Sequence, residues 1–213
     1  MNSAAHIEKL LSRHPETASS IPALKVLIDD TVELFRRGGT FFVAGNGGSA
    51  ADSDHICGEL LKGFLLKRPL AADDRKKFAE LFGAEGEECA GKLQGGLRAV
   101  SLLSHPALSS AFANDVDADL VYAQQLWALS KPGDIFLGIS TGGGAKNIRA
   151  ALMAAGARGV KSFLLTGNRH GACEKYADVV IAVDEKETYL IQEKHIILYH
   201  NFCMAVESEL FEN

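Results

Sequence analysis

Short apolar runs alternate along the chain with longer segments in which apolar residues recur every three or four positions. Continuous apolar runs of this length, followed by turn residues, predict buried strands. Five such runs occur, at 41–45, 99–104, 134–140, 161–167 and 178–183. The helical spacing predicts helices at 3–12, about 20–38, 49–66, about 118–130, 145–157 and 189–211.

The alternation of strands and helices predicts a mostly parallel sheet, because parallel strands need crossover connections. We therefore expect an α/β fold, a doubly wound three-layer sandwich with a five-stranded sheet and two N-terminal helices within 1–38. The length of 213 residues suits a single domain over 1–213. Ligands of such sheets bind beyond the carboxyl ends of the strands, so the loops that follow the strands are the candidate site.

Residues 71–98 interrupt the alternation, because they separate the first strand–helix unit from the next strand by far more than the usual roughly 2–6 residues. The segment carries charges of both signs and contains several glycines. We expect a surface insertion with a short helix near 74–82. The alternative is a lid, or a subunit contact over the site.

The overall charge and hydrophobicity limit the possible partners. The net charge is −5 without a dense lysine and arginine tract, which argues against nucleic acid, since phosphate-backbone binding needs a basic face. No apolar run approaches the roughly 20 residues of a membrane span, and the N-terminus lacks a signal-peptide pattern. We therefore expect a cytoplasmic protein without a membrane partner. Four cysteines without a CxxC pair are expected to be reduced, with Cys57 and Cys203 as packing residues.

The sequence GNGGS at 45–49 lies between a predicted strand and a predicted helix. Its glycines allow a sharp turn, and Ser49 is expected at the N-cap, so that backbone N–H groups point outward at the positive end of the helix. This arrangement suits an anion such as phosphate, although a tight turn without a ligand has the same pattern. It matches neither the dinucleotide G-x-G-x-x-G pattern nor the GxxxxGK[ST] loop.

A second loop of this kind, ISTGGGAKN at 139–147, follows the strand at 134–140. Ser140 and Thr141 supply hydroxyl groups, and the glycines from Gly142 onward supply accessible N–H groups. Two such loops at one end of a parallel sheet favour a small phosphorylated ligand over two accidental turns.

Two pairs of polar side chains lie on the helices nearest these loops. His55 and Glu59 are four residues apart, so they share one helix face. Gln192 and His200 are eight residues apart on the last predicted helix and can also project to one side, although His195 could compete. Spacing alone leaves open whether these residues form one cluster or are separate surface and core residues.

The combination of motifs resembles the sugar-isomerase (SIS) domain family, and within it the phosphoheptose isomerases. The resemblance covers nearly the whole chain and implies an SIS-like fold. It rests on GNGGS at 45–49, Asp52, His55 and Glu59, RP at 68–69, AND at 113–115, GDIFLGIST at 133–141, LTG at 165–167 and IQEKH….H across 191–200. The implied activity is an aldose–ketose isomerisation of sedoheptulose 7-phosphate to glycero-manno-heptose 7-phosphate through an enediol.

The resemblance also implies a set of site residues. Glu59 and His200 would be the catalytic residues that exchange protons. One zinc ion per subunit would be held by His55, Glu59, Gln192 and His200, unless Gln192 contacts substrate instead. The phosphosugar would be held by Asn46, Gly47, Gly48, Ser49, Glu59, Asn114, Asp115, Ser140, Thr141, Gly142 and Gln192. Members of the family usually form tetramers or dimers, which implies a homo-oligomer.

The chain departs from the family pattern at several positions. Gly142 and Ala145 stand where the family loop has serines, Gly63 stands in place of an arginine, and Tyr189 in place of an acidic residue. The insertion is absent from the compact members of the family. These departures leave two alternatives open: an isomerase of another phosphosugar, or a non-catalytic SIS protein that binds phosphosugars or assists replication initiation. The non-catalytic relative that assists replication initiation lacks a glutamate at the position of Glu59.

Overall fold

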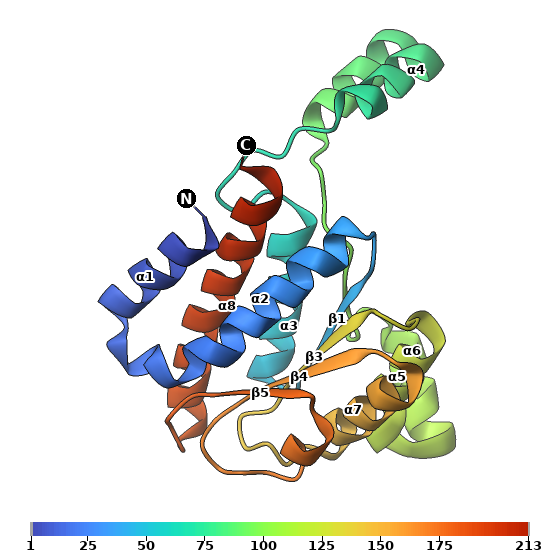
Figure 1. Cartoon of the computed structure of the whole chain (residues 1–213). Coiled ribbons are helices and arrows are strands. Elements are labelled where there is room, and N and C mark those ends of the chain that lie inside the picture. The colour runs from blue at the N-terminus through green and yellow to red at the C-terminus, as the bar shows by residue number, and fades with distance from the viewer. Residues whose placement is uncertain (1, 213) are drawn as a thin grey trace.

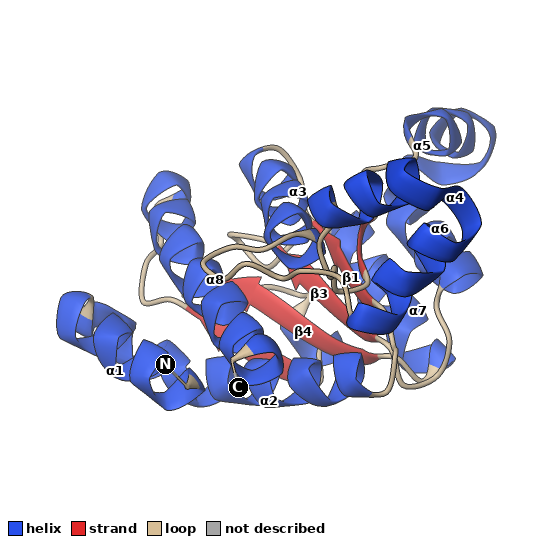
Figure 2. Ribbon diagram, turned by 90° about the horizontal axis from the view of Figure 1, so that it is seen from above, coloured by secondary structure: helices blue, strands red, loops and turns tan. Residues whose placement is uncertain are grey.

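The computed structural model describes residues 2–212, in which a five-stranded sheet lies between two layers of helices (Figures 1 and 2). The strands are β1 (Phe41–Ala44), β2 (Ala99–Ser101), β3 (Ile135–Ile139), β4 (Lys161–Thr166) and β5 (Val179–Ala182). Their order is β2-β1-β3-β4-β5, and every neighbouring pair is parallel. The expected doubly wound α/β fold is thereby confirmed. From β1 the chain crosses to β2 on one side of the sheet, and the later strands β3, β4 and β5 follow on the other side. The strand order therefore changes direction between β1 and β3, and the loops after these two strands flank the usual ligand crevice.

The helices divide between the two faces of the sheet. One face carries α1 (Ser3–Arg13), α2 (Ile21–Arg36), α3 (Gly48–Leu61) and α8 (Thr188–Phe211). The other carries α5 (Pro106–Phe112), α6 (Val121–Leu129) and α7 (Lys146–Arg158). Short connecting turns are η1 (Pro15–Ser20), the π-helical η2 (Ala113–Asp117), η3 (Ala118–Leu120) and η4 (Glu174–Tyr176). Within residues 2–212 no helix combines the length and hydrophobicity that crossing a membrane requires.

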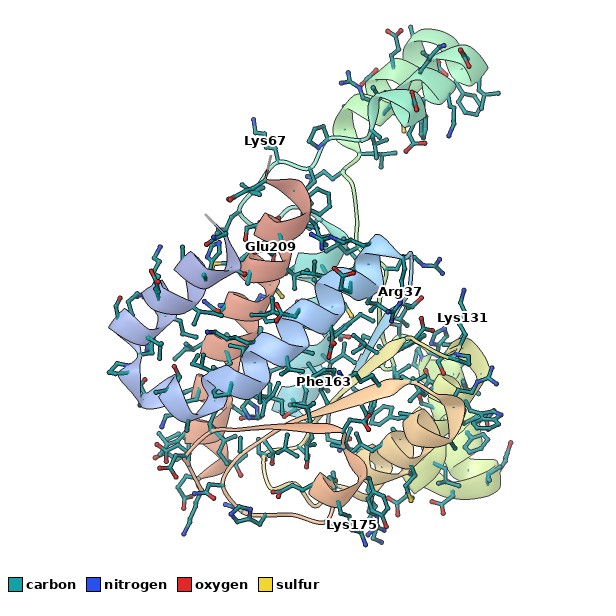
Figure 3. All side chains as sticks on the ribbon, in the orientation of Figure 1. Arg37, Lys67, Lys131, Phe163, Lys175 and Glu209 are labelled. Atoms are coloured by element: carbon teal, nitrogen blue, oxygen red, sulfur yellow. The ribbon has the colours of Figure 1, made fainter. Side chains whose placement is uncertain are left out.

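The central strands are apolar throughout because both of their faces are covered. Every residue of β1 and β3 is buried, and neighbouring side chains of β4 enter opposite cores: Phe163, labelled in Figure 3, packs toward α2 and α8, and Leu164 toward α7. The predicted packing role of Cys57 and Cys203 is confirmed, since both are buried free thiols, and burial raises the pKa of Cys57 to about 12.

Two expected boundaries were wrong. The strand predicted over 99–104 ends at Ser101, because the backbone N–H of Ser104 donates to the Ser101 carbonyl and turns the chain into α5. The helix predicted over 49–66 ends at Leu61, and the segment that follows packs against α8, where Glu207 accepts the backbone N–H groups of Phe64, Leu65 and Leu66.

The insertion forms a helical hairpin, α4 (Ala72–Lys92), which extends away from the rest of the chain (Figure 1). The prediction of one short helix near 74–82 was wrong, since it covers only the first arm. Gly83, with φ of 58°, reverses the chain between the two arms, and a side chain at Gly86 would collide with the Phe78 carbonyl of the opposite arm. At the tip Leu81 and Phe82 are 72% and 62% exposed.

Deleting the hairpin is expected to leave the body folded. Only Gly86 and Ala90 of α4 are buried. The two segments that connect the hairpin to the body lie side by side at its base, where the Gly95 N–H donates to the Arg68 carbonyl at 2.6 Å. A short glycine linker replacing 71–92 should change the melting temperature by less than about 4 °C, which corresponds to about 1 kcal/mol for a chain of this size. A larger decrease would show that the hairpin contributes to the stability of the body.

The same deletion separates the two hypotheses for the insertion. A surface insertion predicts unchanged turnover, whereas a lid or a subunit contact over the site predicts lower turnover at an unchanged melting temperature. The measurement is the initial rate with the substrate proposed below.

Candidate active site

The first glycine loop connects β1 to α3. Gly47 adopts φ of 57° and is itself the N-cap, so that α3 begins at Gly48. The expectation of Ser49 as the N-cap was therefore wrong: Ser49 is buried in the first turn, and its carbonyl accepts the Ser53 hydroxyl. A side chain at Gly48 would collide with the amide of Gln192, so glycine is needed there for α8 to approach the loop.

The second glycine loop meets the first at the same edge of the sheet. The Asn46 and Asn147 side chains form a reciprocal amide pair, with N···O distances of 2.9 and 2.8 Å. The Tyr122 hydroxyl donates to the Gly45 carbonyl at 2.8 Å and supports the first loop from α6. The second loop turns at Gly143, where φ is 63° and the N–H donates to the Ser140 carbonyl. The backbone N–H groups at the N-terminus of α3 thus lie close to the hydroxyl-bearing loop.

Three of the predicted reactive side chains converge on the face where α3 meets α8. Nε2 of His55 lies 3.3 Å from Oε1 of Glu59 and 3.4 Å from Nε2 of His200. The other oxygen of Glu59 pairs with Lys62 at 3.0 Å. Burial, together with nearby His55, lowers the pKa of His200, so its imidazole is neutral at neutral pH. The cluster therefore combines a carboxylate with two imidazoles, the groups that proton transfer requires.

An open groove gives the cluster room on one side. It has a volume of about 290 Å³, lies between α1 and α8, and contains His200 and Phe64 in its wall. The basic residues Lys9 and Arg13 of α1 are among the other residues that line it. α1 is held in place there because the Asn201 side chain donates to the His6 carbonyl, and Glu209, labelled in Figure 3, accepts the Ser3 N–H.

The other predicted residues lie farther from this cluster. The amide of Gln192 lies against Gly48 in the first loop rather than beside the imidazoles. Asn114 donates to Asp115 at 2.8 Å on the exposed turn η2, and within residues 2–212 no hydrogen bond joins either residue to the glycine loops. Their substrate contacts stay a prediction.

The cluster has the donor types and part of the spacing of a zinc site. Ligand atoms of a tetrahedral site with Zn–N bonds of about 2.0–2.1 Å are about 3.3–3.4 Å apart, as are the two measured pairs around His55 Nε2. The third pair, Glu59 and His200, is not in contact, since no ion pair joins these two side chains. As their side chains stand, the described residues contain no group of three or more His, Cys, Asp or Glu arranged to hold a metal ion.

Three functional candidates were missed from the sequence. Asn147 and Tyr122 support the first loop from α7 and α6, and the Tyr199 hydroxyl contacts both Asp52 and His55. Asn147 is part of the quoted second loop, and Tyr199 directly precedes His200, so proximity to the motifs was the available signal.

Comparison with known proteins agrees with this geometry. No protein-family model matches the chain. The phosphoheptose isomerase of Burkholderia pseudomallei strain K96243 is 30% identical over 210 residues, which cover 99% of this chain and 93% of that protein. The chain belongs to the phosphoheptose isomerase family. The expected SIS-type resemblance is thus confirmed.

Other phosphoheptose isomerases extend the agreement. The enzyme of Pelobacter propionicus is 33% identical over 190 residues, covering 89% of this chain and 87% of the relative. The solved structure of the phosphoheptose isomerase GmhA from Neisseria gonorrhoeae superposes with a TM-score of 0.73, at 27% identity and over 96% of both chains. The likeness therefore spans both the glycine loops and the final helix.

Proposed function

We propose that the protein is a phosphoheptose isomerase that interconverts sedoheptulose 7-phosphate and glycero-manno-heptose 7-phosphate. The observation that carries the proposal is the position of the cluster: His55 and Glu59 lie on α3, the helix that begins at the first glycine loop, and His200 meets them from α8. The first glycine loop is in turn joined to the second by the Asn46–Asn147 pair. This arrangement supports a phosphate anchor and an acid–base cluster at two ends of one site. Membership of the family supports the same substrate.

The loops are proposed to bind the phosphate end of the sugar. The backbone N–H groups of Gly47 and Gly48 lie at the positive end of α3, where an anion is favoured, while the N–H of Ser49 donates to the Asn46 carbonyl at 3.0 Å and closes the turn. Ser140 and Thr141 add hydroxyl donors from the opposite loop. Gln192, against Gly48, is positioned to contact the sugar between its two ends.

The cluster is proposed to move the protons. In the ketose-to-aldose direction, Glu59 removes a proton from C1, beside the C2 carbonyl, and the electron pair forms the enediol double bond. Glu59 then returns its proton to C2, while the O1 hydroxyl loses its proton and becomes the aldehyde oxygen. His200 exchanges the proton between the two oxygens, since its neutral imidazole can accept at one position and donate at another.

Zinc is proposed as the cofactor, one ion per subunit, held by His55, Glu59 and His200 with Gln192 as the fourth candidate ligand. The support is the donor set and the two pairs at tetrahedral spacing. When bound, zinc supplies polarisation of the sugar oxygen.

The test is a screen of phosphorylated ketoses and aldoses with the purified protein, with and without added zinc. Interconversion of sedoheptulose 7-phosphate supports the proposal, and turnover of another phosphosugar alone would reassign the substrate. Absence of turnover with every sugar would favour a binding protein. Elemental analysis should find about one zinc per chain, lost in His55→Ala. The proposed homo-oligomer, a tetramer or a dimer, is measured by sedimentation velocity.

Arg169→Ala is expected to raise the KM for the phosphosugar about 10-fold, equivalent to about 1.4 kcal/mol. The Arg169 Nη1 lies beside Gly142, at 3.9 Å from where a side chain would begin, while Nε and Nη2 donate to the Lys186 carbonyl. This cation is placed to replace the hydroxyl that is missing at Gly142. Steady-state kinetics provide the measurement, with Arg75→Ala on the hairpin as control. An unchanged KM would exclude Arg169 from phosphate binding.

A further inference from the structure

The Tyr199 hydroxyl lies between a carboxylate and the imidazole of the site. It is 3.1 Å from Oδ1 of Asp52 and 3.2 Å from Nδ1 of His55. Tyr199 is 2% exposed, and its ring meets those of His55 and His200 edge-on, at centroid distances of 5.5 and 5.1 Å. The three side chains are therefore held in one geometry by packing as well as by hydrogen bonds.

The direction of the hydrogen bonds follows from the groups. A carboxylate only accepts, so the Tyr199 O–H donates to Asp52. The Tyr199 oxygen is then left to accept, and the hydrogen on its other side must come from Nδ1 of His55. We propose that Asp52 and Tyr199 fix the proton of His55 on Nδ1 and thereby present the Nε2 lone pair to the cluster. Both are positioning residues, since they act through His55.

The consequence lies at Nε2, which faces Glu59 Oε1 and His200 Nε2. A metal ligand or a proton acceptor needs an unprotonated nitrogen, and the hydrogen bond at the other ring nitrogen decides which one is free. Asp52 has no competing role in the fold: its second oxygen, Oδ2, is buried and has no partner among residues 2–212. The hydrogen bond to Tyr199 is thus the one that the half-buried Asp52 side chain makes.

The inference deepens the proposed function, because it concerns the same site, but its first test does not need substrate. Protein labelled with 15N-histidine and freed of metal is examined by long-range 1H–15N NMR, which distinguishes the two tautomers. The signal of His55 is assigned by its loss in His55→Gln. The expected wild-type result is a protonated Nδ1, and Tyr199→Phe, which removes only the hydroxyl, should give a mixture with the Nε2–H form.

The second test is zinc affinity, measured by competition with a chelator. Losing a partner of this kind typically weakens metal binding about 10- to 100-fold, and Tyr199→Phe should fall in that range. Tyr176→Phe, which removes the hydroxyl of a tyrosine packed against the core on the opposite face of the sheet from α3 and α8, should bind zinc like the wild type. Because Asp52 acts through Tyr199, Asp52→Asn should weaken binding in the wild type but add nothing in the Tyr199→Phe background.

Two results would overturn the inference: a wild-type His55 with its proton on Nε2, or a Tyr199→Phe protein with unchanged tautomer and zinc affinity. Failure of the proposed function has a different signature. A protein that turns over no phosphosugar, yet carries the Nδ1–H tautomer and loses it in Tyr199→Phe, would contradict the substrate assignment and leave the positioning role of Tyr199 standing.

Discussion

Glu59→Gln is expected to lower the isomerisation rate about 100- to 10,000-fold, the usual contribution of a positioned acid–base group. Glutamine keeps the length and shape of the side chain but cannot accept a proton. The side chain is only 13% exposed, and its two oxygens contact His55 and Lys62, so the substitution should leave the site folded. Initial rates are measured at saturating zinc with the bound metal quantified, which separates lost proton transfer from lost metal.

Glu80→Gln is the matched control. Glu80 also pairs with a lysine along its helix, Lys76 at 3.5 Å, but it lies exposed on the hairpin. It should retain the wild-type rate. Incorporation of solvent deuterium at carbon, followed by NMR in D2O, should fall with turnover in Glu59→Gln. A rate within about threefold of wild type, a barrier change of less than about 0.7 kcal/mol, would remove Glu59 from the mechanism.

The fold was largely predictable because the burial of each strand and the turn after it require particular residue types at neighbouring positions in the sequence. β1 and β3 are buried on both faces, so their residues had to be apolar, and Gly47 and Gly143 stand where the backbone has positive φ. The hairpin was not predictable in full. Its arms bury almost nothing and therefore show no strong apolar periodicity. A glycine at position 83 is as typical of the end of a helix as of the reversal between two helical arms that the structure shows.

The site was predictable only as far as helix periodicity reaches. His55 and Glu59 lie on one helix, and their convergence follows from a spacing of four. Tyr199 meets Asp52 from a position 147 residues away, and no pattern along the chain encodes such a contact. Gln192 lies on the expected helix but nearer the first loop, because Gly48 leaves space for it there.

A buried ion pair joins the segment after α3 to the C-terminal part of α8. Arg68 and Glu207 are 0% and 1% exposed, and Nε of Arg68 donates to Oε1 of Glu207 at 2.7 Å. The same carboxylate accepts the backbone N–H groups of Phe64, Leu65 and Leu66. Arg68 also donates to the Leu60 carbonyl at 2.9 Å. The turn that follows Glu59 is thus held by one charged pair.

Glu207→Gln is expected to lower the free energy of unfolding by about 3–5 kcal/mol, because it leaves the Arg68 guanidinium buried without its counter-charge. The measurement is urea denaturation at neutral pH. Glu33→Gln is the control: Glu33 pairs with Arg36 at the similar distance of 2.6 Å, but these side chains are 63% and 52% exposed. The exposed pair should contribute no more than about 1 kcal/mol. Similar losses in both variants would contradict a stabilising role that depends on burial.

The stability of the wild type should also depend on pH through Glu207. Burial raises the pKa of its carboxyl, but the N–H groups of Phe64 and Leu65 and the charge of Arg68 outweigh burial, so the net pKa is lowered. A pKa that is lower in the folded state means that the unfolded chain binds the proton more readily. The contribution of Glu207 is therefore fully present above the unfolded pKa of about 4.3 and is lost as the pH falls through the folded value. Wild-type stability should decrease in that acidic range more steeply than that of Glu207→Gln, and parallel curves for the two proteins would show that the Glu207 carboxylate is not held as described.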